Sequence, residues 1–315
     1  MTAEAVWRPV RRIVITLPVI WLVVSVIFLL IHLVPGDPIV QMLGEGASAG
    51  DIAALRHAYG FDQPLGVQYV HYWRGVIHAD LGQSLRLHDS VTHLVEERYP
   101  YTFALTAAAL VLGIAGAFPA GIWSALYRGG WQDRSLGVVS LVGLSFPNFA
   151  LGPILILVFS IRLGWLPVSG AGFGGVGDFL LHLALPALTL ALGLAAILTR
   201  MVRTAMLEEL GQDYIRTARA KGLSETRVVY RHALPNALIP ILTVIGLQFG
   251  SLLAGAIVTE TIFSWPGIGR LTLSAISNRD YALVQGCILA VGLTYVAVNL
   301  LTDVAYTLAN PRMRG

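Results

Sequence analysis

Long apolar segments alternate with polar ones along most of the chain. An α-helix needs about 20 apolar residues to cross the hydrocarbon core of a bilayer, and six segments reach that length. They are Ile13–Val34, Tyr101–Tyr127, Leu136–Ile161, Phe179–Arg200, Asn236–Thr259 and Tyr281–Leu308. The pattern therefore predicts an all-α protein with six transmembrane helices.

The longest polar interruption lies between the first two apolar segments, and we name residues 35–98 the cap. It opens with the sequence Pro-Gly-Asp-Pro, which ends the first helix. Asp51–Tyr59 predicts a short helix that ends at Gly60. Gly66–His78 has apolar or aromatic residues at a helical spacing. We expect the cap to be a small folded element on the outer side of the membrane.

The first apolar segment follows three arginines, as the apolar region of a secretory signal peptide does. These are Arg8, Arg11 and Arg12. The segment is longer than the apolar region of a signal peptide, and no small-residue cleavage site follows it. We therefore expect a retained first helix whose N-terminus is cytoplasmic.

Composition supports a membrane protein, because 56% of the 315 residues are hydrophobic and only 12% are charged. Soluble domains carry about 25% charged residues. The single cysteine, Cys287, lies in an apolar segment, so we expect a core residue rather than a disulfide or a metal ligand.

The distribution of charge predicts the orientation. With both termini inside, the cytoplasmic segments hold 14 Lys/Arg and 7 Asp/Glu, and the outer segments hold 7 Lys/Arg and 11 Asp/Glu. An excess of Lys and Arg on the cytoplasmic side is the usual arrangement. The predicted division is an N-terminus with the first helix (1–34), the cap (35–98), a five-helix core (99–308) with a cytoplasmic loop (203–235), and a cytoplasmic tail (309–315).

The cytoplasmic loop contains an unusually polar stretch, Asp213–Pro235. Its pattern predicts two short helices separated at Gly222, a natural helix stop. The second should begin at Ser224 and end before Pro235, because a proline disfavours helix in the residue before it. A structured polar loop between membrane spans indicates a docking element for another protein.

The chain shows no catalytic constellation. The glycine-rich run Gly170–Gly177 has neither the Lys-Ser/Thr nor the preceding strand of a phosphate-binding loop. We find no nucleophile, acid–base pair or metal-ligand cluster that supports an enzyme. The spans also lack the carboxylates near mid-membrane that ion-driven transport usually needs. These observations favour a permease that another protein energises, and nothing indicates a nucleic-acid partner.

The polar loop resembles the cytoplasmic coupling motif of bacterial ABC importer permeases. That motif reads Glu-Ala-Ala, with a glycine six positions after the Glu and Ile-x-Leu-Pro starting ten residues later. Gly222 matches the glycine, Leu234-Pro235 closes the motif, and Ala218 matches an alanine. Arg216 and Thr217 replace the Glu and the first Ala, as is typical of dipeptide and oligopeptide permeases.

Several further motifs carry the same resemblance, in order along the chain. They are PGDP (35–38), DLGQS (80–84), GQDYIRTARAKGL (211–223), TETIFSWPGIGR (259–270), RDYALVQG (279–286) and NPR (310–312). The chain is thus similar to the B-type permease of a dipeptide/oligopeptide ABC importer.

The resemblance implies a type I ABC importer permease fold and a defined set of partners. These are a second related permease, two cytoplasmic ATPase subunits that bind ATP and Mg²⁺, an extracytoplasmic substrate-binding protein and membrane lipid. The chain itself is expected to need no cofactor. Its membrane is the bacterial inner membrane.

The resemblance also implies two groups of functional residues, and polarity and depth suggest a third. The ATPase-coupling residues are Asp213, Tyr214, Arg216, Thr217, Ala218, Arg219, Ala220, Lys221 and Gly222. Candidates for docking the binding protein are Asp37, Trp265, Pro266 and Arg270. Polarity and depth suggest Ser145, Asn148, Gln248, Ser251 and Asn299 for the translocation path. The cations Arg216, Arg219 and Lys221 would meet either acidic ATPase residues or lipid headgroups.

The cargo stays open, because nickel, glutathione, haem and sugar-peptide importers share this permease pattern. The rival classes are an ion-coupled secondary transporter, which would work without ATPases, and a membrane enzyme, which would turn over substrate without transport.

Overall fold

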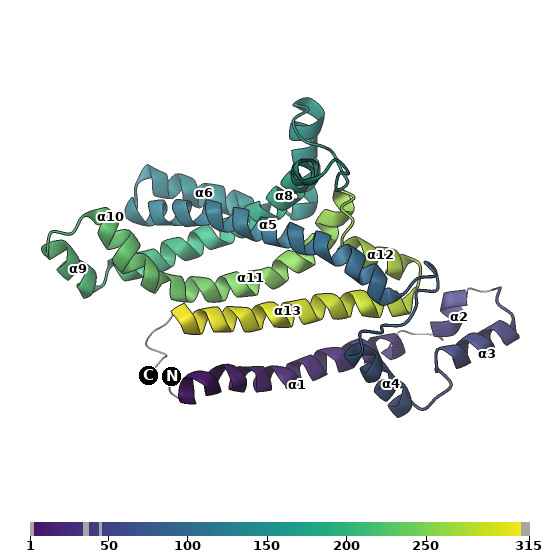
Figure 1. Ribbon diagram of the computed structural model, residues 1–315. Helices are drawn as coiled ribbons and strands as arrows, with labels where there is room; N and C mark the ends of the chain where they lie inside the picture. The colour runs from purple at the N-terminus through teal and green to yellow at the C-terminus, as the bar shows by residue number, and fades with distance from the viewer. Residues whose placement is uncertain (1–2, 34–37, 44–45, 310–315) are drawn as a thin grey trace. The chain divides into compact units, whose positions relative to one another are not determined.

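The computed structural model describes residues 3–33, 38–43 and 46–309, and every regular element in that part of the chain is a helix (Figure 1). Five helices or helical runs are long and apolar enough to span a membrane. They are α1 (Ala3–Leu33), α5 (Val91–Leu126), α8 (Val176–Leu210), the run Glu225–Ile262, and α13 (Tyr281–Ala309). These helices confirm five of the six predicted spans.

The third predicted span is broken rather than continuous, so the expectation of one helix over Leu136–Ile161 was wrong. It consists of α6 (Trp131–Ser145), α7 (Asn148–Leu155) and the π-helical η1 (Ile156–Arg162), with a bend of 102° at the break. Pro147 causes the break, because it has no N–H and forces Phe146 into extended backbone. Counted as one span, the bent pair is the sixth (Figure 1).

The predicted helix break at Gly222 is confirmed, but the end before Pro235 was wrong. A short helix, α9 (Asp213–Ala220), precedes Gly222. After Ser224, the helix α10 (Glu225–Arg227) continues through the π-helical η2 (Val228–Ala233) into α11 (Leu234–Ile262). The π-helical turn changes the hydrogen-bond register just before Pro235, which accommodates the missing N–H in a continuous helix.

The cap is folded, as predicted. It contains α2 (Pro38–Leu43), α3 (Ala49–Ala58) and α4 (Leu65–Ile77), and Ser48 caps α3 by accepting a hydrogen bond from Asp51 N at 3.2 Å. The sequence pattern missed α12 (Ile268–Ser277), which lies between the last two spans.

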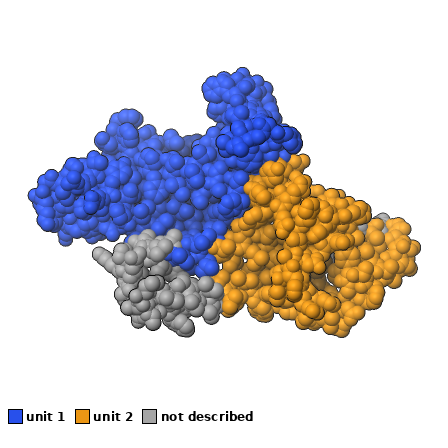
Figure 2. Space-filling view, in the orientation of Figure 1, with its two compact units in different colours: residues 1–9, 103–265, 298–315 blue, residues 10–102, 266–297 orange. Residues whose placement is uncertain are grey.

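The chain forms two compact units, shown in Figure 2. Unit 1 comprises residues 1–9, 103–265 and 298–315, and unit 2 comprises residues 10–102 and 266–297. The most buried span is α8, half of whose apolar window lies inside unit 1 among α6, α7 and α11. In unit 2, the start of α5 packs on α12 and α13, and Cys287 is a buried member of that core, as expected.

Candidate functional site

The helix α9 is amphipathic, with two residues turned inward. Ile215 is fully buried and Ala218 is 7% exposed. The other predicted coupling residues are exposed: Asp213, Tyr214, Arg216, Thr217, Arg219, Ala220, Lys221 and Gly222. Ala218 therefore holds α9 in place, while its neighbours form a polar outer face.

The platform beneath α9 is an apolar cluster drawn from four other elements of unit 1. Ile122 and Ala125 come from α5, Val202, Ala205 and Met206 from α8, Val228, Val229 and Ala233 from η2, and Ala237 and Ile241 from α11. Each of these side chains is at most 5% exposed. Dense apolar packing resists small deformations, so a push on α9 is expected to move these helix ends together.

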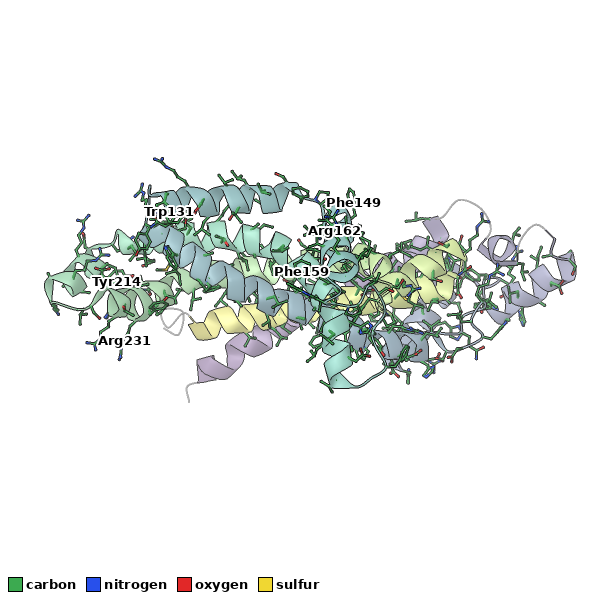
Figure 3. The ribbon with its side chains drawn as sticks, turned by 90° about the horizontal axis from the view of Figure 1, so that it is seen from above. Trp131, Phe149, Phe159, Arg162, Tyr214 and Arg231 are labelled. Carbon is green, nitrogen blue, oxygen red and sulfur yellow. The ribbon has the colours of Figure 1, made fainter. Side chains whose placement is uncertain are left out.

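Tyr214 fixes the start of α9 with polar contacts. Its hydroxyl donates a hydrogen bond to Glu209 of α8 and accepts one from Asn236 Nδ2 of α11 at 3.0 Å. The same Asn236 amide donates to the His232 carbonyl at 3.1 Å. Figure 3 shows Tyr214 and Arg231 at the same end of unit 1 as Trp131, the first residue of α6.

Gly222 ends α9 in the left-handed region, with φ +75°. Its N–H donates to the Arg219 carbonyl at 2.9 Å, and Leu223 N donates to the Ala218 carbonyl at 3.4 Å. A Cβ at this position would meet open space. Glycine is therefore favoured here because of its positive φ and not because a side chain would clash.

Two of the three cations offered for docking already have partners within the chain. Arg219 binds Glu225 through two contacts of 2.7 and 3.2 Å, which raise the pKa of the guanidinium, and Arg216 Nη1 lies 3.2 Å from Asp213 Oδ1. The Lys221 ammonium makes no hydrogen bond or ion pair with any residue that the structure describes, although its backbone N–H donates to the Thr217 carbonyl at 3.1 Å. Lys221 is thus the cation most available to another protein.

Sequence reasoning missed a second polar feature, close to the platform. Arg203 of α8 binds Asp133 of α6 through Nε at 2.6 Å and Nη2 at 2.8 Å. Ser124 Oγ of α5 and Gly129 N of the α5–α6 turn donate to the same carboxylate at 2.6 and 2.9 Å. Asp133 is 8% exposed. The only signal in the sequence was one acid between Arg128 and Arg134.

Three of the five candidate path residues line one cavity of about 270 Å³. Asn148, Gln248 and Ser251 surround it together with the residues of the α6–α7 break. The Asn148 side chain lies between Gly193 of α8 and Gly255 of α11. Ser145 does not line this cavity and donates to the Leu141 carbonyl at 2.9 Å, and Asn299 does not line it either.

The candidates for docking the binding protein differ in how far they are buried. Trp265 is fully buried, with its ring 5.3 Å from that of Phe179, whereas Pro266 is half-buried and Arg270 is exposed on α12. Asp37 lies outside the described residues. A surface for another protein is thus offered by Arg270 and not by Trp265.

Two of the motifs that carry the family resemblance meet inside unit 2. Ser84 Oγ of DLGQS donates to Asp280 Oδ2 of RDYALVQG at 2.5 Å, and these residues are 2% and 1% exposed. Asp280 also accepts hydrogen bonds from Arg86 N and Leu283 N. At the end of the second motif, a Cβ on Gly286 would overlap Val91 of α5. Both motifs therefore hold the cap to α13.

Solved structures share the fold. A structure titled "Inward facing conformations of the MetNI methionine ABC transporter" (CY5 SeMet soak crystal form) matches with a TM-score of 0.58 at 19% identity, over 69% of this chain and 96% of the solved one. The native crystal form of the same transporter gives a TM-score of 0.56. The chain thus has a type I ABC importer permease fold.

Relatives extend over nearly the whole chain. The "Di/tripeptide transport system permease protein DppB" of Pseudomonas aeruginosa is 45% identical, covering 96% of this chain and 97% of that protein. The "Glutathione transport system permease protein GsiC" of Escherichia coli O6:H1 is 42% identical, covering 97% and 98%. Residues 8–106 match the family model "Binding-prot-dependent transport system membrane comp, N-term". Residues 117–315 match "Binding-protein-dependent transport system inner membrane component", and the chain belongs to this family of multi-span inner-membrane permeases.

Proposed function

We propose that this chain is a transmembrane permease subunit of an ATP-driven importer that moves dipeptides or oligopeptides into the cytoplasm. The observation that carries the proposal is α9, a polar helix exposed on a buried apolar platform at one end of unit 1. Relatives of the chain that are named for di/tripeptide and glutathione transport support a peptide cargo. Glutathione, itself a tripeptide, is the second candidate cargo. Nickel and haem are further alternatives, because their importers share the same permease sequence pattern.

The proposed assembly has two permease subunits, two ATPase subunits and one extracytoplasmic binding protein. ATP and Mg²⁺ bind to the ATPase subunits, and this chain hydrolyses no ATP. Both termini and α9 face the cytoplasm, in accordance with the excess of Lys and Arg on that side. Arg270 and the acidic cap face the binding protein.

In this mechanism, closure of the ATPase subunits on ATP displaces α9. The platform cluster passes the displacement to the ends of α5, α8 and α11. The contact of Arg203 with Asp133 couples α8 to α6, whose other end borders the cavity at the α6–α7 break. Because these helices move as rigid bodies, the cavity would open alternately to the two sides of the membrane. Asn148, Gln248 and Ser251 would offer neutral hydrogen bonds to a passing peptide.

Weak polar contacts suit this role. A permease must release its cargo, and the binding protein supplies the selection, so a path with few charged groups is expected. An ion-coupled secondary transporter is less well supported, because it would have no use for the exposed face of α9.

The test is uptake in liposomes that contain the chain with its partner permease, ATPases and binding protein. We expect ATP-dependent uptake of labelled dipeptide or glutathione and no ATP hydrolysis by the chain alone. Uptake driven by an ion gradient without ATPases would contradict the proposal. A preference for glutathione over dipeptides would keep the mechanism and change the cargo.

A further inference from the structure

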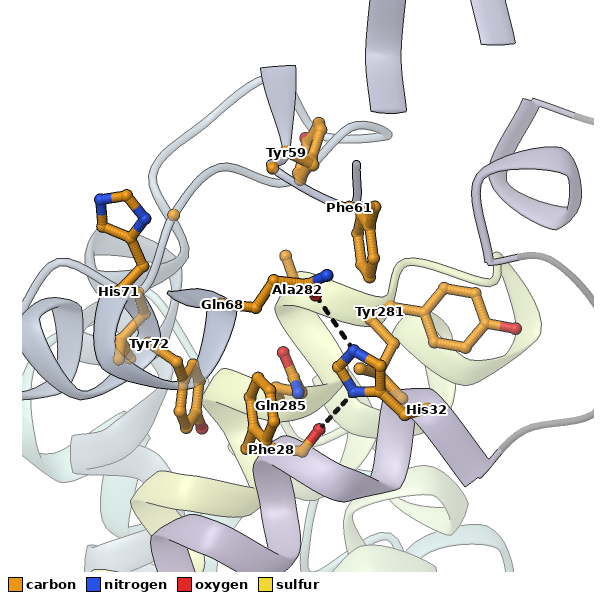
Figure 4. Close-up of a pocket in the computed structure, with 14 residues that line it drawn as sticks. Phe28, His32, Tyr59, Phe61, Gln68, His71, Tyr72, Tyr281, Ala282 and Gln285 are labelled. Atoms are coloured by element: carbon orange, nitrogen blue, oxygen red, sulfur yellow. Dashed lines mark hydrogen bonds between the residues drawn. The ribbon is translucent and has the colours of Figure 1, made fainter. Parts of the chain in front are cut away.

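Unit 2 contains a cavity of about 190 Å³ that the transport mechanism does not use (Figure 4). It lies among the end of α1, the turn after α3, α4, the DLGQS loop and the start of α13. Half of the residues that line it carry rings: Phe28, Tyr59, Phe61, Tyr72 and Tyr281, with the imidazoles of His32 and His71. For comparison, a cavity of about 150 Å³ in another protein holds benzene.

None of the described residues that line the wall is Lys, Arg, Asp or Glu. Figure 4 shows His32 held between two partners, Gln68 Oε1 at 3.1 Å and the Phe28 carbonyl at 3.2 Å. Burial raises the pKa of Tyr72 to about 12, so this phenol stays neutral. A cation entering the cavity therefore meets no lysine or arginine to repel it.

Two acceptor atoms on the wall remain available. The Gln285 amide Nε2 donates to the Ile27 carbonyl at 3.0 Å, which leaves Oε1 as the open end of the side chain. The buried Tyr72 hydroxyl has no hydrogen-bond partner among the described residues. Buried polar groups in proteins are nearly always paired, so both atoms are suited to a hydrogen-bond donor that enters the cavity.

We propose that this cavity binds a small alkylammonium group. The faces of aromatic rings carry negative potential and attract ammonium ions, which is how aromatic cages recognise quaternary ammonium ligands. The cap around the cavity has 8 Asp/Glu against 4 Lys/Arg, which attracts cations to this region and disfavours anions. Neutral acceptors complete the arrangement. The ammonium can belong to a free solute or to the ethanolamine headgroup of a lipid, and both have the same chemistry.

The test compares choline with 3,3-dimethyl-1-butanol, which has the same shape without the charge. The permease–ATPase complex is placed in nanodiscs of phosphatidylglycerol alone, and both probes are titrated by calorimetry. We expect choline to bind about tenfold more tightly than the alcohol, in line with a desolvated cation–π interaction. Equal affinity for the two probes, or no binding of choline, would overturn the proposal.

Variants locate the binding. Phe61→Leu removes one ring from the wall and should weaken choline binding about fivefold while leaving the alcohol unchanged. Phe103→Leu, at a ring 52% exposed outside the cavity, is the matched control and should change neither. Ala282→Phe should fill the space and abolish both. Choline binding that is insensitive to Phe61→Leu and Ala282→Phe would place the ligand elsewhere and refute the site.

A second set of nanodiscs identifies the source of the ammonium. Replacing half of the phosphatidylglycerol by phosphatidylethanolamine should weaken apparent choline binding if the lipid headgroup occupies the cavity. Unchanged choline binding, still lost in Ala282→Phe, would support the site and assign it to a free solute.

Discussion

The α9 region of unit 1 and the Ser84–Asp280 contact of unit 2 are both polar interruptions in an apolar chain. They differ in whether the polar side chains are exposed or buried. In α9 the polar side chains are exposed and two apolar ones anchor the helix. In unit 2 the polar side chains are buried at 2% and 1% exposure and bind each other. Polarity in a membrane protein therefore marks either a surface for a partner or an internal contact, and burial separates the two.

If this distinction is right, a change in the backbone after α9 should damage coupling and leave folding intact. Gly222→Val places a β-branched residue at φ +75°. The left-handed conformation costs a residue other than glycine about 1–2 kcal/mol. We expect peptide uptake to fall about tenfold or more, with normal membrane insertion. Uptake and binding-protein-stimulated ATP hydrolysis are measured in the same vesicles.

Gly222→Asn is the matched control, since asparagine adopts the left-handed region more readily than other side chains. The space around the Cβ is open, so this variant should keep most of the uptake. Normal uptake in Gly222→Val would show that the turn after α9 has no part in coupling.

The Asp133–Arg203 pair belongs to the internal class and should affect both stability and coupling. Among the described residues, Arg203→Met leaves the carboxylate of Asp133 with Ser124 and Gly129 as its partners. Loss of one partner of a buried pair costs about 3–5 kcal/mol, and because Arg203 is 33% exposed we expect about 2 kcal/mol here. The melting temperature in detergent should fall.

A rescue experiment separates packing from coupling at this pair. Asp133→Asn with Arg203→Met removes both charges and should recover most of the melting temperature. Because the double variant still lacks the bidentate contact, we expect fewer peptides moved per ATP hydrolysed. Full recovery of that ratio would show that the pair only stabilises the fold.

At the contact between the cap and the start of α13, a variant should show the reverse of the Gly222 result. Asp280→Ala leaves the Ser84 hydroxyl and the amide of Leu283 without their acceptor. Each buried unpaired group costs about 1–3 kcal/mol. We expect a lower melting temperature and lower yield, with an unchanged ratio of transport to ATP hydrolysis in the protein that folds. Ser84→Ala should cost about 1 kcal/mol.

The smallest effects should come from single cations on α9. Lys221→Ala removes a cation that has no partner within the described chain. We expect the ATPase subunits to associate more slowly with this variant, and the association rate to depend less on salt concentration. Arg219→Ala instead breaks an exposed contact with Glu225, worth less than about 1 kcal/mol. Equal salt dependence in Lys221→Ala and the unchanged protein would argue against a direct contact.

Sequence pattern predicted the spans and the Gly222 break, because both depend on local properties: run length, and the tolerance of glycine for positive φ. It failed where the effect of a proline on a helix depends on the backbone before it. Pro147 breaks a span with a 102° bend, whereas Pro235 sits in a continuous helix because a π-helical turn precedes it. Both prolines are followed by an asparagine, and the pattern does not show whether a π-helical turn precedes them, so it could not tell them apart.

The site was predictable to the level of its segment and not of its individual contacts. The motif predicted the coupling residues, which lie on α9 and in the turn after it, but it did not show that Ala218 points inward or that Arg219 is already paired with Glu225. The bond between Asp133 and Arg203 joins residues 70 positions apart, and no local pattern reveals such a pair.

The central claim, that the outer face of α9 contacts an ATPase, can be tested by cysteine labelling. Thr217→Cys, exposed on α9, is made in a Cys287→Ser background, with the exposed Arg128→Cys as control. A membrane-impermeant maleimide is applied to inverted vesicles with and without ATPase subunits. We predict that the ATPases protect residue 217 and leave residue 128 reactive. Equal labelling of residue 217 in both conditions would contradict the account.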